Sequence, residues 1–117
     1  MTLYHDYALE PKHDTQKSYY GKATYREYRR SDRSCPEVRV LYSYHTPVCW
    51  VDMRHREFHR LWRGWSDTTM RHVREFCAQA ADDLAELYGV AVDDTGLYVT
   101  TKAQWNALPV EKLPCFR

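Results

Sequence analysis

Residues 58–76, FHRLWRGWSDTTMRHVREF, decide how this chain folds. Gly64 interrupts a short aromatic run, and glycine tolerates the tight backbone of a corner between a strand and a helix. Ser66 stands where an N-cap belongs, because its hydroxyl can accept from the free amides of a first helical turn. Asp67 adds negative charge at the positive end of the helix dipole. The stretch therefore predicts a short strand at Phe58, a corner and a helix that begins at Asp67.

The residues that follow predict one long amphipathic helix. Apolar positions recur every three or four residues, which is the period of one helix face. Gly89 fits the position just after a helix end, where glycine is preferred. We predict a helix over residues 67 to about 88, and the alanine-rich middle leaves a break near Gln79 open. The positions predicted to face the core are Met70, Val73, Cys77, Ala80, Leu84 and Leu87.

The chain before the corner reads as short strands. Residues 18–29, 37–44 and 48–53 are rich in β-branched and aromatic side chains with period-2 alternation, and residues 45–47 read as the turn of a hairpin. Gly21 predicts a bulge. Residues 1–17 show no clean period, so an edge element and disorder both stay open. The alternation places Val38, Val40, Tyr42 and Tyr44 on one face of their strand.

The chain after Gly89 reads as a loop, a short helix and a tail. A short strand at 97–99 stays open, Thr101 is the expected cap of a helix that Pro109 ends, and the tail from Glu111 is expected to be loose. We predict an α+β fold in one domain, an antiparallel meander of about four short strands packed on one long helix, with a short C-terminal helix. Within residues 1–117 we distinguish an N-terminal extension (1–17), the sheet and long helix (18–88), and an acidic loop, short helix and tail (89–117).

Charge is unevenly distributed along the chain although its formal net value is only +1. Residues 17–74 contain 13 Lys or Arg and six Asp or Glu, whereas residues 75–117 contain three and seven. A basic block thus lies between acidic ones, which is either ordinary solvated charge or a face for phosphate or an acidic protein. Aromatic residues make up 15% of the chain, ten of them tyrosine, which favours a contact surface as well as a core.

Composition also bounds the compartment. No run approaches the roughly 20 apolar residues of a membrane span, and the polar N-terminus does not resemble a signal peptide. The four cysteines are far apart and form no C-x-x-C pair, so reduced thiols in a cytoplasmic protein are the simplest expectation.

The candidates for chemistry are weak. His55 and His59 have the spacing of zinc ligands on a helix, but they fall in a turn and strand, so a metal-dependent enzyme is the last-ranked hypothesis. Cys49 and Cys77, with His72 as a conceivable base, are better explained as core cysteines. The acids Glu75, Asp82, Asp83 and Glu86 are expected on the solvent side of the helix. We therefore expect no enzyme, catalytic residue, metal or cofactor.

Arginines interleaved with aromatics are the remaining signal. Arginine binds phosphate bidentately and exposed aromatic rings stack on bases, so this run could grip nucleic acid. The same tryptophans could instead bury the corner between sheet and helix. The residues concerned are Arg54, Arg56, Arg60, Trp62, Arg63, Trp65, Arg71 and Arg74.

Four segments of the chain are distinctive in their order and spacing: YGKA at 20–23, LYSY-x-T-x-V at 41–48, FHRLW-x-GWS-x-TTM-x-HV-x-EF at 58–76, and K-x-x-W at 102–105. Together they resemble a family of small uncharacterised proteins from phages and other mobile elements. The chain departs from that pattern in its N-terminal extension and in an acidic insert between Gln79 and Thr101. The resemblance implies a phage or plasmid context and no established activity.

That context favours a binding protein. Small proteins of mobile elements often block host defence complexes, CRISPR effectors among them, which is an argument by analogy. The acidic insert, with Asp82, Asp83, Asp93 and Asp94, could imitate nucleic acid or dock on a basic groove. The expected partner is a host ribonucleoprotein or nucleic-acid-processing complex, with a DNA- or RNA-binding module as the alternative.

Overall fold

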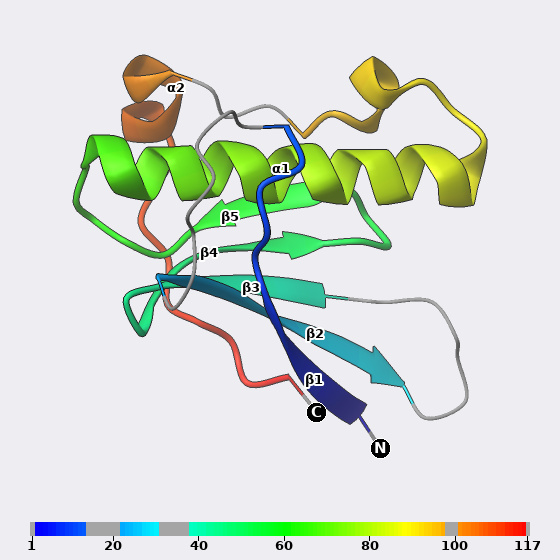
Figure 1. Cartoon of the computed structure of the whole chain (residues 1–117), viewed down its shortest axis with the longest axis horizontal. Coiled ribbons are helices and arrows are strands. Elements are labelled where there is room, and N and C mark those ends of the chain that lie inside the picture. The colour runs from blue at the N-terminus through cyan, green and yellow to red at the C-terminus, as the bar shows by residue number, and fades with distance from the viewer. Residues whose placement is uncertain (1, 14–21, 31–37, 98–100, 117) are drawn as a thin grey trace.

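The computed structural model describes residues 2–13, 22–30, 38–97 and 101–116 of the 117-residue chain. Five strands form one antiparallel sheet in the order β1-β2-β3-β4-β5, and one long helix covers one of its faces (Figure 1). The predicted α+β meander is confirmed. Its elements are β1 (Thr2–Ala8), β2 (Ala23–Arg30), β3 (Val38–Ser43), β4 (Thr46–Asp52), β5 (Glu57–Arg60), α1 (Asp67–Tyr88), the 3-10 turn η1 (Val92–Thr95) and α2 (Lys102–Ala107).

Helix α1 has the predicted ends. The Ser66 hydroxyl accepts from the Thr69 amide at 3.1 Å, and Gly89 has a left-handed φ of 65°, which a residue without Cβ adopts at little cost. The helix runs without a break past Gln79. Leu87, predicted on the apolar face, is exposed instead, because the sheet ends before the last turn of the helix. The other predicted core positions, Met70, Val73, Cys77, Ala80 and Leu84, are buried.

The N-terminal segment supplies the additional strand. Residues 2–8 pair along the whole of β2 as β1, and Leu9 then enters the core. The chain continues across α1, where the buried Glu75 carboxylate accepts from the backbone amides of Lys12 and His13 at 3.0 and 2.7 Å. The expectation that Glu75 faces solvent is therefore wrong. A buried carboxylate needs such donors, and they fix the N-terminal segment to the helix.

The hairpin between β3 and β4 turns at residues 44–45, so the turn begins one residue before and ends two residues before the predicted turn at 45–47. Tyr44 and His45 have φ values of 51° and 71°, as in the two-residue turns whose twist matches that of paired strands, and Pro47 lies within β4. Tyr44 therefore does not continue the alternation. Val38, Val40 and Tyr42 do share one face, and it is the face turned away from α1, since Leu41 belongs to the core beneath the helix.

The corner at 61–66 is fixed by the short helix α2. Trp105 of α2 is fully buried, and its indole N–H donates to the Gly64 carbonyl at 2.9 Å. A Cβ on Gly64 would lie 2.5 Å from the Trp62 ring, so the glycine allows that ring to cover the backbone. The aromatic run thus packs the junction between β5 and α1 rather than forming a longer strand.

The C-terminal tail is ordered against the sheet, contrary to the expected loose tail. Val110 makes a parallel bridge with Arg60 at the edge of β5, and the Glu111 amide donates to the Arg60 carbonyl at 2.9 Å. Phe116 packs on Tyr28 and Trp50. Backbone pairing and aromatic contact together hold the tail. The bulge predicted at Gly21 and the strand suggested at 97–99 lie largely outside the described residues, as do residues 18–21 of the first predicted strand.

Candidate interaction site

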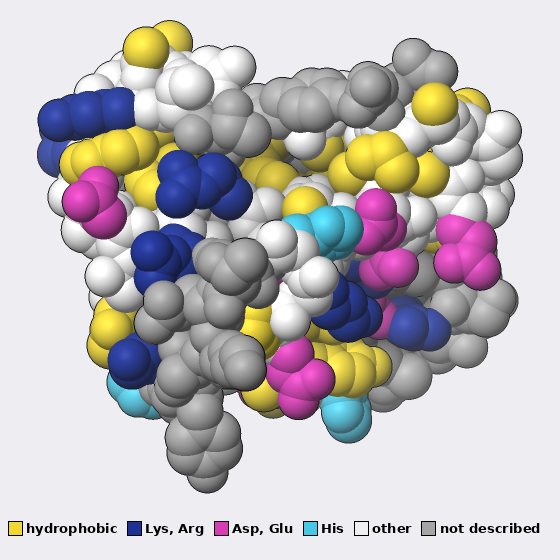
Figure 2. All heavy atoms as spheres, turned by 45° about the horizontal axis from the view of Figure 1, so that its top comes forward, with side chains coloured by type: hydrophobic (Ala, Val, Ile, Leu, Met, Phe, Trp, Pro, Cys, Tyr) yellow, Lys and Arg dark blue, Asp and Glu magenta, His cyan; other side chains and the backbone are white. Residues whose placement is uncertain are grey.

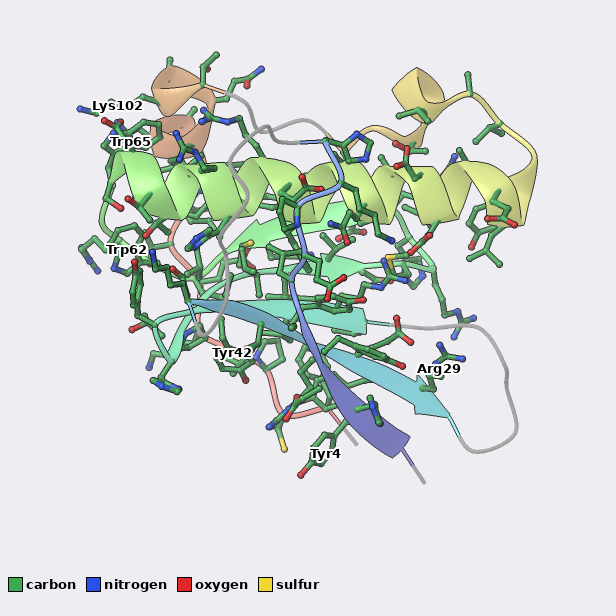
Figure 3. All side chains as sticks on the ribbon, viewed as in Figure 1. Tyr4, Arg29, Tyr42, Trp62, Trp65 and Lys102 are labelled. Carbon is green, nitrogen blue, oxygen red and sulfur yellow. The ribbon has the colours of Figure 1, made fainter. Side chains whose placement is uncertain are left out.

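The predicted basic-aromatic run is divided between the two ends of α1. Arg54 and Arg56 lie in the turn between β4 and β5, where the Arg56 guanidinium is 5.8 Å from the centre of the Tyr88 ring at the end of α1. Trp62 and Trp65 lie at its start (Figure 3), and Arg63 stands between them in the corner that leads into the helix. The 22 residues of α1 span about 33 Å at 1.5 Å per residue. Residues close in sequence therefore do not form one continuous basic face.

Arg60 is a structural residue and not an exposed phosphate contact. It is buried, and its guanidinium donates to the carbonyls of Trp62 and Arg63 at 2.9 and 2.7 Å. It also donates to the carbonyls of Trp105 and Leu108, and its Cζ lies 4.8 Å from the centre of the Trp105 ring. Burial lowers the pKa of this guanidinium. The prediction that Arg60 contacts a partner is corrected, because its donors are occupied within the fold.

Trp62 and Trp65 are half-buried and pack against the core, which favours the alternative that they bury the corner. Lys102 of α2 reaches over Trp65, with its Nζ 5.6 Å from the ring centre (Figure 3). Arg63 beside them is exposed. The cations at the start of α1, Arg63 and Lys102, therefore lie beside tryptophan rings that already pack against the core.

The outer side of α1 changes charge along its length. Arg71 and Arg74 lie in its first half, and Asp82, Asp83 and Glu86 in its second half. Figure 2 shows a group of Lys and Arg side chains on the left of this face and Asp and Glu gathered toward its right. The last turn of α1 contains no basic residue although a helix C-terminus favours cations. The helix dipole therefore does not explain the acidic half.

Two of these acids are tied to neighbouring segments. Asp82 lies 2.7 Å from His13 Nε2, and Asp83 lies 2.6 Å from Arg39 Nη2. Arg39 also bonds the buried Glu27 at 2.9 Å, and Glu27 in turn bonds Arg29. This chain of alternating charges joins β2, β3 and α1. Removal of Glu27 would take from the buried Arg39 one of its two carboxylate partners, which is costly.

A hollow of about 500 Å³ opens beside this network. Arginines of β2 and β3 form one part of its wall, and acidic and apolar side chains near the end of α1 form the other. Figure 3 shows Arg29 at this side of the sheet, away from the tryptophan corner. The lining residues are Arg29, Arg39, Asp83, Glu86 and Leu87.

Apolar side chains are exposed at the end of α1 and in the η1 turn that follows it. Leu87, which lines the hollow, and Tyr88 are 47% and 51% exposed, and Val92 of η1 is 42% exposed. Exposed large apolar side chains that lie together, unlike scattered ones, indicate a contact surface. We name the set Asp82, Asp83, Glu86, Leu87, Tyr88 and Val92 the acidic end of α1. Asp93 and Asp94 belong to η1 by their backbone, and their side chains lie outside the described part of the chain.

The two histidines weighed as metal ligands have separate partners. His55 lies 2.9 Å from Asp52, while His59 lies 2.9 Å from Glu111 and 3.2 Å from Glu57. Among the described residues no group of three or more His, Cys, Asp or Glu is arranged to hold a metal ion. The described helices also include none long and apolar enough to cross a membrane.

The predicted core cysteines are confirmed as buried. Burial raises the pKa of Cys77 to about 12 and that of Cys49 well above its ordinary value. His72 is buried as well, and its Nδ1 lies 3.0 Å from the Ser43 hydroxyl in the core. Two of the segments quoted for the family resemblance thus meet in this contact, which holds α1 on β3.

Comparison with known proteins gives a family and no activity. A model of a family of unknown function, DUF8033, matches residues 7–88. The chain belongs to this family. The match begins within β1 and ends with α1, so most of the N-terminal extension and residues 79–88 of the presumed acidic insert are part of the family's common region. No curated protein and no solved structure matches the chain.

Residues that sequence reasoning missed lie at the acidic end and in the tail. Leu87 was predicted on the apolar face of the helix, and Tyr88 was assigned to no face; both are exposed where the sheet ends. Glu86 was expected to be solvated, with no role in a site. The available signal was the clustering of apolar and acidic residues around the helix stop at Gly89.

Proposed function

We propose that this protein is a non-enzymatic accessory protein of a phage or mobile element that binds and inhibits host nucleic-acid machinery, in particular a CRISPR effector complex. The context comes from the resemblance of residues 20–23, 41–48 and 58–76 to small proteins of mobile elements. The expected partner is a host ribonucleoprotein or nucleic-acid-processing complex, met in the bacterial cytoplasm.

The observation that carries the proposal is the acidic end of α1. Interfaces commonly have an apolar centre and a polar rim, and Leu87, Tyr88 and Val92 are such a centre beside Asp82 and Glu86. A surface that binds nucleic acid is rich in Lys and Arg, so an acidic partner complements it. The hollow lined by Glu86 and Leu87 offers room for one long basic side chain of the partner.

The charge around the hollow agrees with a basic occupant. Arg39 is already held by Glu27 and Asp83, at 2.9 and 2.6 Å, so its charge is balanced within the fold. Glu86 is exposed at the rim. A guanidinium or ammonium that enters beside Glu86 gains a carboxylate partner and packs its methylene groups on Leu87.

The proposal is tested in cells and then on the purified complex. Cells that carry a CRISPR system and express this protein are challenged with a targeted phage or plasmid, and co-purification from the host lysate identifies the partner. We expect protection of the phage or plasmid. No protection against any co-resident CRISPR system would count heavily against inhibition of CRISPR effectors.

Single substitutions then show which end of α1 binds the partner. Glu86→Lys and Tyr88→Ala are expected to weaken binding at least tenfold, because both alter the centre or rim of the acidic end. Arg63→Glu is the matched control, a charge reversal at the other end of α1. Loss of binding in Arg63→Glu with full binding in Glu86→Lys would transfer the interface to the start of the helix.

The second candidate function is a small DNA- or RNA-binding module. Exposed Arg63 beside Lys102 and the half-buried Trp65 favours it, since cations and aromatic rings bind single-stranded nucleic acid. A gel shift titrated with salt tests this alternative. Only micromolar or weaker binding to every DNA and RNA at low salt would remove it.

A further inference from the structure

Strand β1 is an open edge of the sheet. It is the outermost strand and pairs with β2 on one side, and the described part of the chain places no strand beyond it (Figure 1). The opposite edge is covered, because Val110 bridges to Arg60 of β5 and the Glu111 amide donates to the Arg60 carbonyl at 2.9 Å. An open edge is a row of backbone donors and acceptors on which another strand can pair.

The backbone groups that point outward from β1 follow from its pairing with β2. The Leu9 amide donates to the Ala23 carbonyl at 3.0 Å, and these two residues continue the β1–β2 register by one step. Residues of an antiparallel strand alternate between those that bond one neighbour and those that point away from it. The odd-numbered residues of β1 therefore bond β2, and the even-numbered ones turn their N–H and C=O groups outward. The outward set is Thr2, Tyr4, Asp6 and Ala8.

The edge has none of the features by which proteins commonly prevent strand pairing. Seven consecutive residues of β1 pair with β2 without a shift in register, so the described strand contains no bulge that would bend it away. It also contains no proline and no lysine. Its one carboxylate, Asp6, is bonded by the Arg26 guanidinium at 2.7 and 3.0 Å, which balances the charge. An incoming strand therefore meets neither a missing amide nor an unbalanced carboxylate.

Exposed tyrosines flank the edge on both faces of the sheet. Tyr4 is 60% exposed on the face turned away from α1, where its ring centre lies 5.9 Å from that of Tyr28 (Figure 3). Tyr7 is 37% exposed on the other face and stacks on Tyr25 at 5.2 Å between ring centres. A strand added to β1 would cover these rings as well as pair the backbone, and cross-strand contacts of aromatic side chains stabilise a sheet.

We propose that two copies of this chain pair through β1 in antiparallel orientation and form a dimer with one continuous sheet. The outward groups of both copies can bond only when even-numbered residues lie opposite even-numbered residues. A two-fold axis at His5 meets this condition and pairs the whole of β1, with about eight hydrogen bonds between the copies. Tyr4 of each copy then lies opposite Asp6 of the other.

The neighbouring registers are less favourable. An axis at Asp6 would place two carboxylates directly opposite each other, which destabilises a strand pair. An axis at Tyr4 pairs fewer residues of β1. The sequence of β1 thus favours pairing with itself in the register centred on His5.

Self-pairing also gives an assembly that stops at two copies. It uses the open edge of each copy, and the edge at β5 is already occupied by the tail in both, so no strand edge remains on which further copies could add. The inference does not depend on the function proposed above, since it uses none of the residues of the acidic end of α1.

Sedimentation equilibrium of the full chain tests whether the dimer forms. Concentrations from about 1 μM to about 1 mM cover the range in which a small interface dissociates. We expect a mass of twice the 14.0 kDa of one chain at the upper end of this range. The mass of a single chain at every concentration would overturn the proposal and leave the edge to a strand of a different protein.

A proline variant tests whether β1 is the interface. Tyr4→Pro removes an outward N–H and leaves the bonds to β2 in place, so the chain should fold normally by circular dichroism. We expect the dissociation constant of the dimer to rise at least about tenfold, because each dimer loses two hydrogen bonds. Tyr4→Ala is the matched control, which loses the ring but keeps the amide, and should weaken the dimer less. A Tyr4→Pro chain that dimerises as tightly as the unchanged one would overturn the assignment of β1.

Disulfide cross-linking tests the register and does not depend on the proline variant. In a background with Cys35→Ser and Cys115→Ser, His5→Cys places two thiols opposite each other at the axis. The two Cα atoms are then about 4.5 Å apart, within the reach of a disulfide bond. We expect mild oxidation to link the chains in His5→Cys, and to do so about tenfold more slowly in Tyr4→Cys and Asp6→Cys. Fastest linkage at residue 4 or 6, or no linkage at residue 5, would overturn the register.

Discussion

Aromatic side chains occur at both ends of α1, but they are largely buried at its start and exposed at its end. At its start, tryptophan and arginine side chains are turned inward, with Trp105 fully buried and Arg60 bonded to four carbonyls. At its end, Leu87 and Tyr88 are left to solvent. The difference arises because α2 and the corner cover the first turn, whereas the sheet stops short of the last one. A rich aromatic composition is therefore no guide to a contact surface until the covering elements are known.

The largest effect is expected at the start of α1. Trp105→Ala removes a fully buried ring, its hydrogen bond to Gly64 and the surface on which Arg60 stacks. We expect a loss of about 3–5 kcal/mol in the free energy of unfolding. Urea denaturation followed by circular dichroism measures it. Asn106→Ala, an exposed neighbour in α2, is the control and should cost no more than about 0.5 kcal/mol.

Two buried cysteines between the ends of α1, Cys77 in the helix and Cys49 in β4, make the free energy of unfolding depend on pH. Burial raises the pKa of Cys49 and Cys77 in the folded protein, so above about pH 8.5 the unfolded chain releases protons that the native state keeps. Stability then falls as the pH rises, by about 1.4 kcal/mol for each thiol at pH 9.5. Urea midpoints at pH 7.5 and 9.5 measure this loss. The double variant Cys49→Val, Cys77→Ala should show a smaller loss, and an equal loss would contradict the assignment.

Glycine substitutions sharpen the contrast between the ends. Gly64→Ala places a Cβ 2.5 Å from the Trp62 ring, and we expect a cost of about 1–3 kcal/mol through overpacking. Gly89→Ala meets no atom within 4 Å, so its cost of about 1 kcal/mol comes from the left-handed backbone alone. In a Trp62→Ala background the cost of Gly64→Ala should largely disappear while that of Gly89→Ala remains. Thermal or urea unfolding of the three single variants and the two double variants measures these costs, and a Gly64→Ala cost that persisted in the Trp62→Ala background would contradict this account.

The smallest effect on stability is expected at the acidic end. Leu87→Ser should change the free energy of unfolding by no more than about 0.5 kcal/mol, since the side chain is 47% exposed. The same variant should weaken partner binding in a pull-down or titration. A loss of stability above about 1.5 kcal/mol would identify Leu87 as a core residue and remove the main support for a contact surface there.

Much of the fold could be predicted because its signals are local. The cap at Ser66, the period of the apolar positions and the stop at Gly89 specify α1 almost to the residue. Strand β1 was harder to predict from the sequence, because its described side chains are exposed and the strand is held by pairing with β2. The turn at Tyr44–His45 was predicted at residues 45–47, since neither Tyr44 nor His45 is a glycine or asparagine, the residues that commonly indicate positive φ.

The candidate site was predicted only in part for a related reason. The basic-aromatic run from Arg54 to Arg74 is contiguous in sequence, but the antiparallel turn at 53–56 and the corner at 61–66 send its members to opposite ends of α1. Arg60 looked like its neighbours and is instead buried, with its guanidinium bonded to carbonyls of the corner and of α2 and its C-cap. A charged side chain can bind a partner or can hold the fold together. Which of the two it does depends on packing between distant parts of the chain, and residue spacing in the sequence does not predict that packing.

By itself the sequence determined the elements: a meander of β-rich segments, a capped amphipathic helix and a short final helix, because propensity, capping and hydrophobic period act over a few residues. Only the tertiary structure decided which aromatic and charged groups remain exposed. Exposure depends on where the sheet ends, where α2 docks and where the tail returns, and each of these is set by contacts between residues far apart in the chain.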